Sequence, residues 1–221
     1  MRVRDVMSTN VITIPTHTTL ADARRTLDAH RIRRLPLVDR GKLVGIVTKD
    51  ALDRTGPSQL TTFSIHEMSY LLNKITVKEI MRRDVVTVTP DMTVEGAVGL
   101  AQTKKVGSLV VVEGDKVVGM TTTNDFFYKV LNPMLGIGMA GSRIVIRNCC
   151  QGPEIEKVIA AINKLGVRII ALYTFNLTFT EGEKQGIPAH QDLAVHLATE
   201  DSTRIVEEIQ KLGYSVEKRA R

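Results

Sequence analysis

A hydroxyl and a carboxylate stand three residues apart in Gly119-Met-Thr-Thr122-Thr-Asn-Asp125, where an apolar stretch gives way to a polar one. A carboxylate at the edge of a strand can accept hydrogen bonds from ribose hydroxyls, as acidic residues do in dinucleotide folds. The same carboxylate can cap a helix, where an acidic residue in the first turn contributes about 0.3–1 kcal/mol. Taken alone, the spacing favours capping, so ligand binding needs support from the rest of the chain.

The other residues able to do chemistry are scattered along the sequence. The two cysteines, Cys149 and Cys150, are adjacent and lack the C-x-x-C spacing of redox sites. Arg147 lies close enough to lower a thiol pKa, which leaves a thiol-based redox sensor as an alternative. No histidine has a cysteine or carboxylate partner at metal-ligand spacing, and no G-x-x-x-x-G-K-[ST] loop occurs. We therefore predict no catalytic residue, no metal site and no enzymatic activity. The histidines are His17, His30, His66, His190 and His196.

The elements that position these residues are duplicated. Residues 3–52 align with residues 77–126 at a constant offset of 74, and 12 of the 50 aligned pairs are identical. Self-similarity at a fixed offset indicates a repeated structural unit. Two such units are expected to pack about a pseudo-twofold axis, with a groove between them suited to a small ligand.

Each copy predicts the order β-α-β-β-α. Thr19 and Thr93 stand at the N-caps of helices with apolar residues at helical spacing. Two strands joined by a polar turn follow, and a last helix closes the unit. The predicted strands are 11–14, 35–38 and 43–48 in the first copy, and 85–88, 109–112 and 117–121 in the second.

The remaining chain predicts a connector, a linker and a second fold. Ser64-Ile-His-Glu67 is a capping box that begins a connecting helix. The stretch 131–141 is rich in Gly and Met and predicts a partly packed linker. Residues 142–221 read as βαβ twice, a ferredoxin-like βαββαβ arrangement in an α/β (α+β) protein. The predicted divisions are 1–56, 57–76, 77–130, 131–141 and 142–221.

The composition limits the kind of partner. With 43% hydrophobic and 24% charged residues the chain is typical of a globular protein, and it holds no apolar run long enough to span a membrane. The N-terminus lacks a secretion signal, so we expect a cytoplasmic protein. The net charge of +6 arises in residues 1–56, with 11 Lys/Arg against 6 Asp/Glu. Nucleic-acid binding would need a more continuous basic surface, so a polyanion partner is a distant alternative.

On these motifs, residues 3–127 resemble a tandem pair of CBS domains, a Bateman module. Residues 142–219 resemble an ACT domain, and the combination is similar to the acetoin-utilisation accessory family. The resemblance implies a regulatory homodimer with no resident cofactor and with an adenosine-containing effector: AMP, ADP, ATP or S-adenosylmethionine. It also implies a partner that is a metabolic enzyme.

The resemblance also implies the binding residues. The CBS signature is a glycine and two apolar residues followed by Ser/Thr-x-x-Asp, which the second repeat keeps. Thr122 and Asp125 would hold ribose and phosphate, and the base would lie near residues of the same repeat, namely Thr87, Gly107, Ser108, Leu109 and Met120. The first repeat has Ala51 in place of the aspartate, so we expect a weaker, empty or differently used cleft there. Its secondary candidates are Thr13, Arg33, Arg34, Thr48 and Asp50.

In the ACT-like part the candidate site is the loop Cys149-Cys-Gln-Gly-Pro153, whose backbone N–H groups could receive an amino-acid carboxylate. ACT domains commonly have Pro-Gly at this position. The order Gly-Pro found here removes one donor, because proline has no N–H. A scaffold that only dimerises, or an amino-acid sensor acting through this part, are therefore the alternatives to nucleotide sensing.

Overall fold

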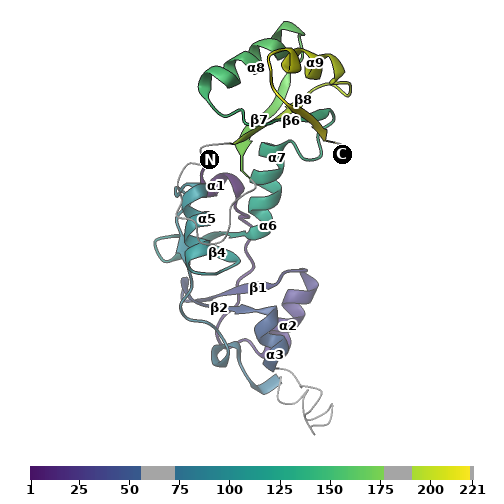
Figure 1. Ribbon diagram of the computed structural model, residues 1–221. Coiled ribbons are helices and arrows are strands. Elements are labelled where there is room, and N and C mark those ends of the chain that lie inside the picture. The colour runs from purple at the N-terminus through teal and green to yellow at the C-terminus, as the bar shows by residue number, and fades with distance from the viewer. Residues whose placement is uncertain (56–72, 177–190, 220–221) are drawn as a thin grey trace. The chain divides into compact units, whose positions relative to one another are not determined.

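The computed structural model describes residues 1–55, 73–176 and 191–219. The chain divides into two units, Met1–Phe126 and Phe127–Arg221, and the second begins ahead of the predicted linker (Figure 1). The predicted connecting helix falls mostly outside the described residues, although Ile75 packs against the core of the first repeat. Within the described part of the chain, no helix is both long and apolar enough to cross a membrane.

The first unit contains two copies of the predicted repeat. Thr19 and Thr93 are the N-caps of their helices, and each hydroxyl accepts the backbone N–H three residues on, at 3.1 Å. The first copy consists of α1 (Val3–Val6), α2 (Leu20–Ala29), β1 (Arg34–Asp39), β2 (Lys42–Thr48) and α3 (Lys49–Thr55). The second consists of η1 (Val77–Glu79), β3 (Thr87–Val88), α5 (Val94–Thr103), β4 (Ser108–Glu113), β5 (Lys116–Thr122) and α6 (Thr123–Phe126).

The predicted first strands are shorter than the sequence pattern suggested. In the second copy, β3 pairs in parallel with β4, and the Val110 N–H donates to the Val86 carbonyl at 3.2 Å. In the first copy only an isolated bridge between Ile14 and Leu37 remains. The residue equivalent to Val110 is Pro36, which has no N–H to donate, so the ladder cannot extend on that side.

Each repeat begins with a segment that pairs with the other repeat. Ser8 and Met120 of β5 exchange backbone hydrogen bonds of 2.9 and 3.0 Å. Arg82 and Ile46 of β2 exchange two bonds of 2.9 Å. These pairs are equivalent at the offset of 74, so the pseudo-twofold symmetry expected from the duplication is present in the hydrogen bonding.

The exchanged segments also carry core residues. Val3 is fully buried in the second repeat's core beside Leu109, and Val77 is fully buried in the first repeat's core beside Leu35. Each core is therefore completed by a side chain from the other repeat's leading segment. The two repeats depend on one another for burial of apolar surface, the main favourable term in folding.

The glycine of each CBS signature makes room for a methionine of the exchanged segment. A Cβ atom added to Gly119 would lie 2.5 Å from the Met7 sulfur, and one added to Gly45 would lie 2.8 Å from the Met81 sulfur. Real Cβ atoms do not approach that closely. The glycine therefore allows a close contact between the repeats, which a larger residue could enter only if the methionine side chain moved.

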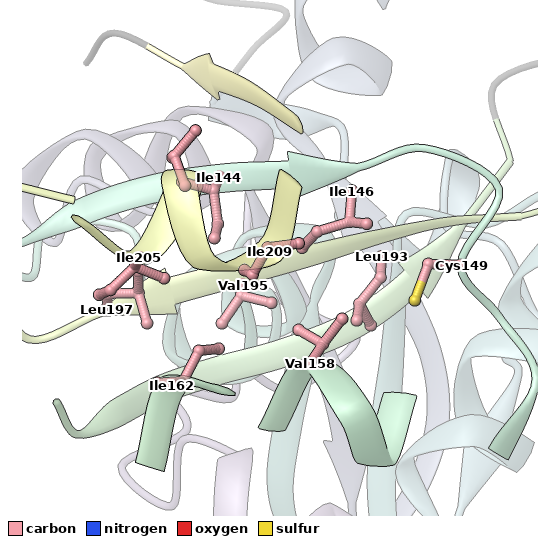
Figure 2. Packing of buried hydrophobic residues seen from close by; sticks show 11 residues of the cluster. Ile144, Ile146, Cys149, Val158, Ile162, Leu193, Val195, Leu197, Ile205 and Ile209 are labelled. Carbon is pink, nitrogen blue, oxygen red and sulfur yellow. The ribbon is translucent and has the colours of Figure 1, made fainter. Parts of the chain in front are cut away.

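The second unit has the predicted ferredoxin-like topology. Its sheet order is β7-β8-β6-β9 with antiparallel pairing throughout. Helices α8 and α9 pack on one face of this sheet, over a core that includes Ile144, Val158, Ile162 and Ile209 (Figure 2). The elements are β6 (Ser142–Ile146), α8 (Gly152–Lys164), β7 (Ile169–Phe175), β8 (Asp192–Leu197), α9 (Thr203–Lys211) and β9 (Val216–Arg219).

The Gly- and Met-rich stretch belongs to the second unit and is packed only in part, because Gly136 is buried whereas Met134, Ile137 and Met139 are exposed. It follows the π-helical segment η2 (Phe127–Leu131) and contains α7 (Asn132–Leu135). Gly136 ends α7 with φ 64° and lies against the imidazole of His196. Gly141 has φ 125° and lies against the Leu197 carbonyl, so neither position has room for a side chain.

Replacing the signature glycine tests the interlocked packing. We expect Gly119→Ala to lower the free energy of unfolding by about 1–3 kcal/mol, the usual cost of overpacking a filled site. Urea unfolding followed by circular dichroism measures it. Gly99→Ala is the matched control, because Gly99 is an exposed glycine in α5 with nothing near its missing Cβ. That change should stabilise by about 0.5–1 kcal/mol. Equal effects of the two changes would contradict the packing role.

Candidate ligand-binding site

A cavity of about 660 Å³ opens in the first unit, and both repeats line it. The first repeat contributes Ser8, residues 10–12, residues 31–34 and Asp50. The second contributes Gly107, Met120 and residues 122–125. The volume falls within the range of about 300–1,000 Å³ common for small-molecule sites.

Asp125 and Thr122 lie on the cavity wall at the start of α6. One carboxylate oxygen of Asp125 accepts hydrogen bonds from the Thr122 N–H at 2.9 Å and from the Thr122 hydroxyl at 2.7 Å. The Asp125 N–H in turn faces the Thr122 hydroxyl oxygen at 3.4 Å. The two side chains thus form the cap that the spacing favours, and they present a carboxylate to the cavity at the same time.

Arg34 extends from the first repeat to the second. Its guanidinium Nη2 lies 3.0 Å from the place where Gly107 would carry a Cβ, and the Thr123 hydroxyl lies 3.6 Å from the same point. Burial lowers the pKa of Arg34, the neighbouring charge of Arg33 lowers it further, and Asp50 acts in the opposite direction. The attraction of Asp50 therefore does not offset the effects of burial and of Arg33 on the charged Arg34 side chain.

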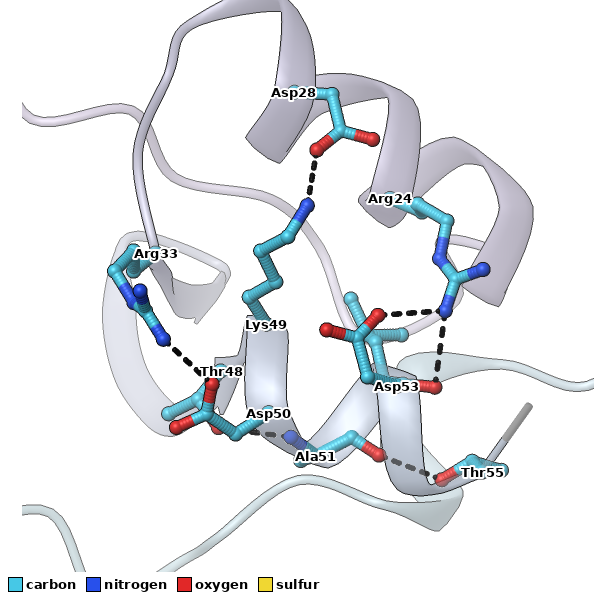
Figure 3. A network of polar contacts seen from close by, with 10 residues as sticks. Arg24, Asp28, Arg33, Thr48, Lys49, Asp50, Ala51, Asp53 and Thr55 are labelled. Atoms are coloured by element: carbon cyan, nitrogen blue, oxygen red, sulfur yellow. Dashed lines mark hydrogen bonds and ion pairs between the residues drawn. The ribbon is translucent and has the colours of Figure 1, made fainter. Parts of the chain in front are cut away.

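In the first repeat, charged residues of α3, the helix equivalent to α6, form ion pairs with neighbouring side chains (Figure 3). Asp50 pairs with Arg33 at 2.9 Å, Asp53 pairs with Arg24 at 2.8 Å, and Lys49 pairs with Asp28. Ala51 stands where the second repeat has Asp125. Its N–H donates to the Thr48 hydroxyl at 3.2 Å, so the cap is kept without the carboxylate.

The structure brings together some of the sequence-predicted residues and not others. Those that line the cavity are Gly107, Met120, Thr122, Asp125, Arg33, Arg34 and Asp50. Those that do not line it are Thr87, Ser108, Leu109, Thr13 and Thr48. Leu109 is fully buried in the core, so its side chain cannot reach a ligand in this cavity.

The base site near Thr87, Ser108 and Leu109 of the second repeat stays a prediction, because these residues do not line this cavity. Segments 10–12 and 31–34 of the first repeat face Thr122 and Asp125 instead, because each repeat's leading segment lies against the other repeat. Sequence reasoning missed Asn10, Arg31, Thr123 and Asn124. Arg31 has φ 52°, a left-handed turn conformation that its counterpart Lys105 shares. The one sequence signal that could have identified Arg31 is the turn that follows the first helix of each repeat and is present in both copies.

In the second unit, the loop considered for amino-acid binding is already satisfied internally. The Glu154 carboxylate accepts the N–H groups of Cys150 and Gln151, both at 3.0 Å. These two hydrogen bonds lower the pKa of Glu154, so the carboxylate stays ionised. A side chain of the protein therefore occupies two donors that an amino-acid carboxylate would need.

The remaining chemistry of the described residues is sparse. They contain no cluster of three His, Cys, Asp or Glu side chains able to hold a metal ion. Cys149 is fully buried, and burial raises the pKa of its thiol to about 11, with smaller contributions from Glu154 and Cys150. Because the thiolate is the reactive form, Cys149 is unsuited to redox sensing at neutral pH.

Two interlocked β-α-β-β-α repeats enclosing a shared cavity define a pair of CBS domains. The family model described as CBS domain matches residues 3–55 and 77–132, and this chain belongs to that family. A CBS domain-containing protein of Dictyostelium discoideum is 33% identical over 137 residues, covering 60% of this chain and 94% of that protein.

Similar pairs occur in proteins of different kinds. A putative acetoin utilization protein (AcuB) from Vibrio cholerae, known as a crystal structure, is 32% identical with a TM-score of 0.50. The similarity covers 60% of this chain and 91% of that one. An inosine-5'-monophosphate dehydrogenase of Korarchaeum cryptofilum is 31% identical over 126 residues, which is 56% of this chain and 23% of that enzyme. This chain thus spans less than a quarter of that relative.

The thiol pKa gives a direct test. In the native protein at pH 8 we expect iodoacetamide to leave Cys149 unmodified, because the buried thiol remains protonated. Mass spectrometry of peptides measures the modification, with urea-unfolded protein as the control in which both cysteines react.

Raising the pH from about 9.0 to about 11 should lower the free energy of unfolding, because the unfolded thiol loses a proton that the folded thiol keeps. Rapid modification of native Cys149 would contradict its protection by burial and would support the redox-sensor alternative.

Proposed function

We propose that this protein is a non-enzymatic, cytoplasmic regulator whose CBS pair binds an adenine nucleotide in the cavity shared by the two repeats. The observation that carries the proposal is that Asp125 of the second repeat and Arg31, Arg33 and Arg34 of the first line the same cavity. A carboxylate suits the ribose hydroxyls, and guanidinium groups suit phosphate oxygens.

The charges favour a phosphate-bearing ligand over S-adenosylmethionine. Arg33 is paired with Asp50, whereas Arg34 has a pKa lowered by burial and by its cationic neighbour. An anion beside Arg34 would relieve this unfavourable environment, and a sulfonium cation would worsen it. AMP, ADP and ATP are therefore the leading candidates.

Regulation requires that the ligand bind one arrangement of the repeats better than another. Coupling of that kind typically amounts to about 1–3 kcal/mol. A ligand held by both repeats can supply it, because any change in their packing alters its contacts. We propose that a homodimer relays occupancy to a metabolic enzyme. The likeness to the V. cholerae protein described as an acetoin utilization protein suggests an enzyme of acetoin use.

The principal alternative is a scaffold that binds no ligand. Thr122 and Asp125 already satisfy one another as a helix cap, which is all that a scaffold requires. Amino-acid sensing through the loop before α8 is less favoured, because Glu154 occupies two of its donors.

A thermal-shift titration with AMP, ADP, ATP and S-adenosylmethionine tests the proposal. A nucleotide at 100 times its Kd should stabilise the native protein by about 2.7 kcal/mol and raise the Tm. Asp125→Ala should abolish the nucleotide-induced rise. Glu95→Ala is the matched control, because Glu95 is an acidic first-turn residue of the same repeat outside the cavity. A rise unchanged in Asp125→Ala would remove the site from this cavity, and no rise with any ligand would favour the scaffold.

The role of Arg34 can be tested separately. Arg34→Gln should weaken ATP or ADP binding by about tenfold or more, the scale of a hydrogen bond to a charged group, and leave adenosine binding unchanged. Isothermal titration calorimetry measures both affinities. Arg83→Gln serves as the control, since Arg83 is an exposed arginine of the same unit outside the cavity. An equal loss for adenosine and its phosphates would show that Arg34 shapes the cavity without contacting phosphate.

A further inference from the structure

The second unit holds a cavity of its own, of about 290 Å³, on the sheet face that α8 and α9 leave uncovered. Ile144, Val195 and Leu197 belong to the core under the helices. Because side chains alternate along a strand, Val145, Ala194 and His196 project to the opposite face. Leu135 of α7 lines the cavity together with these strands.

The hollow results from a small residue in the middle of the sheet. Ala194 lies on β8 between Val145 of β6 and Tyr173 of β7, to which it is directly paired. The Tyr173 and Phe175 rings, 6.1 Å apart, line the same cavity. A larger side chain at Ala194 would fill this space. The cavity is at the small end of ligand sites and is mainly apolar.

One cation faces this apolar space. Arg143 is half-buried, and its Nη2 donates to the Gly136 carbonyl at 2.8 Å. Across the described residues, no carboxylate forms an ion pair with Arg143. By contrast, Arg147, which follows the end of β6, forms ion pairs with both Asp192 and Glu217 at 2.5 Å. A half-buried guanidinium without a carboxylate beside an apolar hollow suits an anionic group on an apolar ligand.

We propose that this cavity binds a small apolar carboxylate, with its hydrocarbon part over Ala194 and its carboxylate at Arg143. A free amino acid fits less well, because none of the described side chains that line the cavity is acidic to pair with its ammonium group. The site lies on the opposite side of the sheet from the helix-bearing face and is independent of the nucleotide cavity. Its effector would be a second input to the same chain.

Phenylacetate is a suitable probe, with 2-phenylethanol as an uncharged compound of similar shape. Ligand-detected NMR titration of the full chain gives the two dissociation constants. We expect phenylacetate to bind at least about tenfold more tightly than the alcohol. Arg143→Gln should remove that preference, whereas Arg143→Lys should keep part of it. Ala194→Leu should abolish binding of both compounds, and the smaller Ala194→Val should weaken it. Arg168→Gln, an exposed arginine outside the cavity, should change neither constant.

Far-UV circular dichroism of each variant establishes that the fold is kept, and Arg143→Lys and Ala194→Val remain informative where a more drastic variant unfolds. Equal binding of phenylacetate and the alcohol by the native chain would overturn the role of Arg143. Binding that is unaffected by either change at Ala194 would overturn the location. Failure of phenylacetate to bind at millimolar concentration would overturn the proposal as a whole.

Discussion

The first unit depends on the exchange of leading segments between its repeats. Val3 and Val77 are fully buried, and each completes the core of the repeat to which it does not belong. Ser8 pairs through its backbone with β5 of the second repeat, and Arg82 pairs in the equivalent way with β2 of the first. Neither repeat can then form its full core alone. The exchange also shapes the shared cavity, because Ser8 pairs with Met120 of β5 and both residues line it.

Two differences between the equivalent positions of the repeats break the symmetry of the first unit. Where the second repeat has Asp125, the first has Ala51, and only the backbone N–H donating to the threonine hydroxyl is common to both. Gly107 is replaced by Arg33 at the equivalent position, so one side of the axis is open and the other carries a guanidinium. Arg34 enters the space that Gly107 leaves. The duplicated fold therefore presents one cavity in which carboxylate and guanidinium groups meet.

Much of this architecture could be predicted from the sequence because local signals agreed with one another. The threonine N-caps, the polar hairpin turns and the 74-residue offset all concern neighbouring residues or a translation along the chain. The exchange of segments could not be predicted in this way. Nothing in Val3-Arg-Asp-Val-Met7 indicates which copy it will contact, since both cores present similar apolar surfaces. Assigning Thr87 and Leu109 to the site of Asp125 assumed that each repeat builds its own site, whereas the cavity beside Asp125 is lined by both repeats.

Asp125, the residue proposed to bind the ribose, lies next to the boundary between the two units. Asp125 is in the first turn of α6, and the first unit ends at the next residue, Phe126. The chain continues without a break into the π-helical segment Phe127–Leu131. π-Helical turns are rare and are frequently found at functional sites, because their hydrogen bonding is less favourable than that of an α-helix. A ligand that competes for the hydrogen bonds between Asp125 and Thr122 would alter the start of this continuous helical stretch. Under the proposed function, a ligand at Asp125 would therefore act next to the junction between the two units.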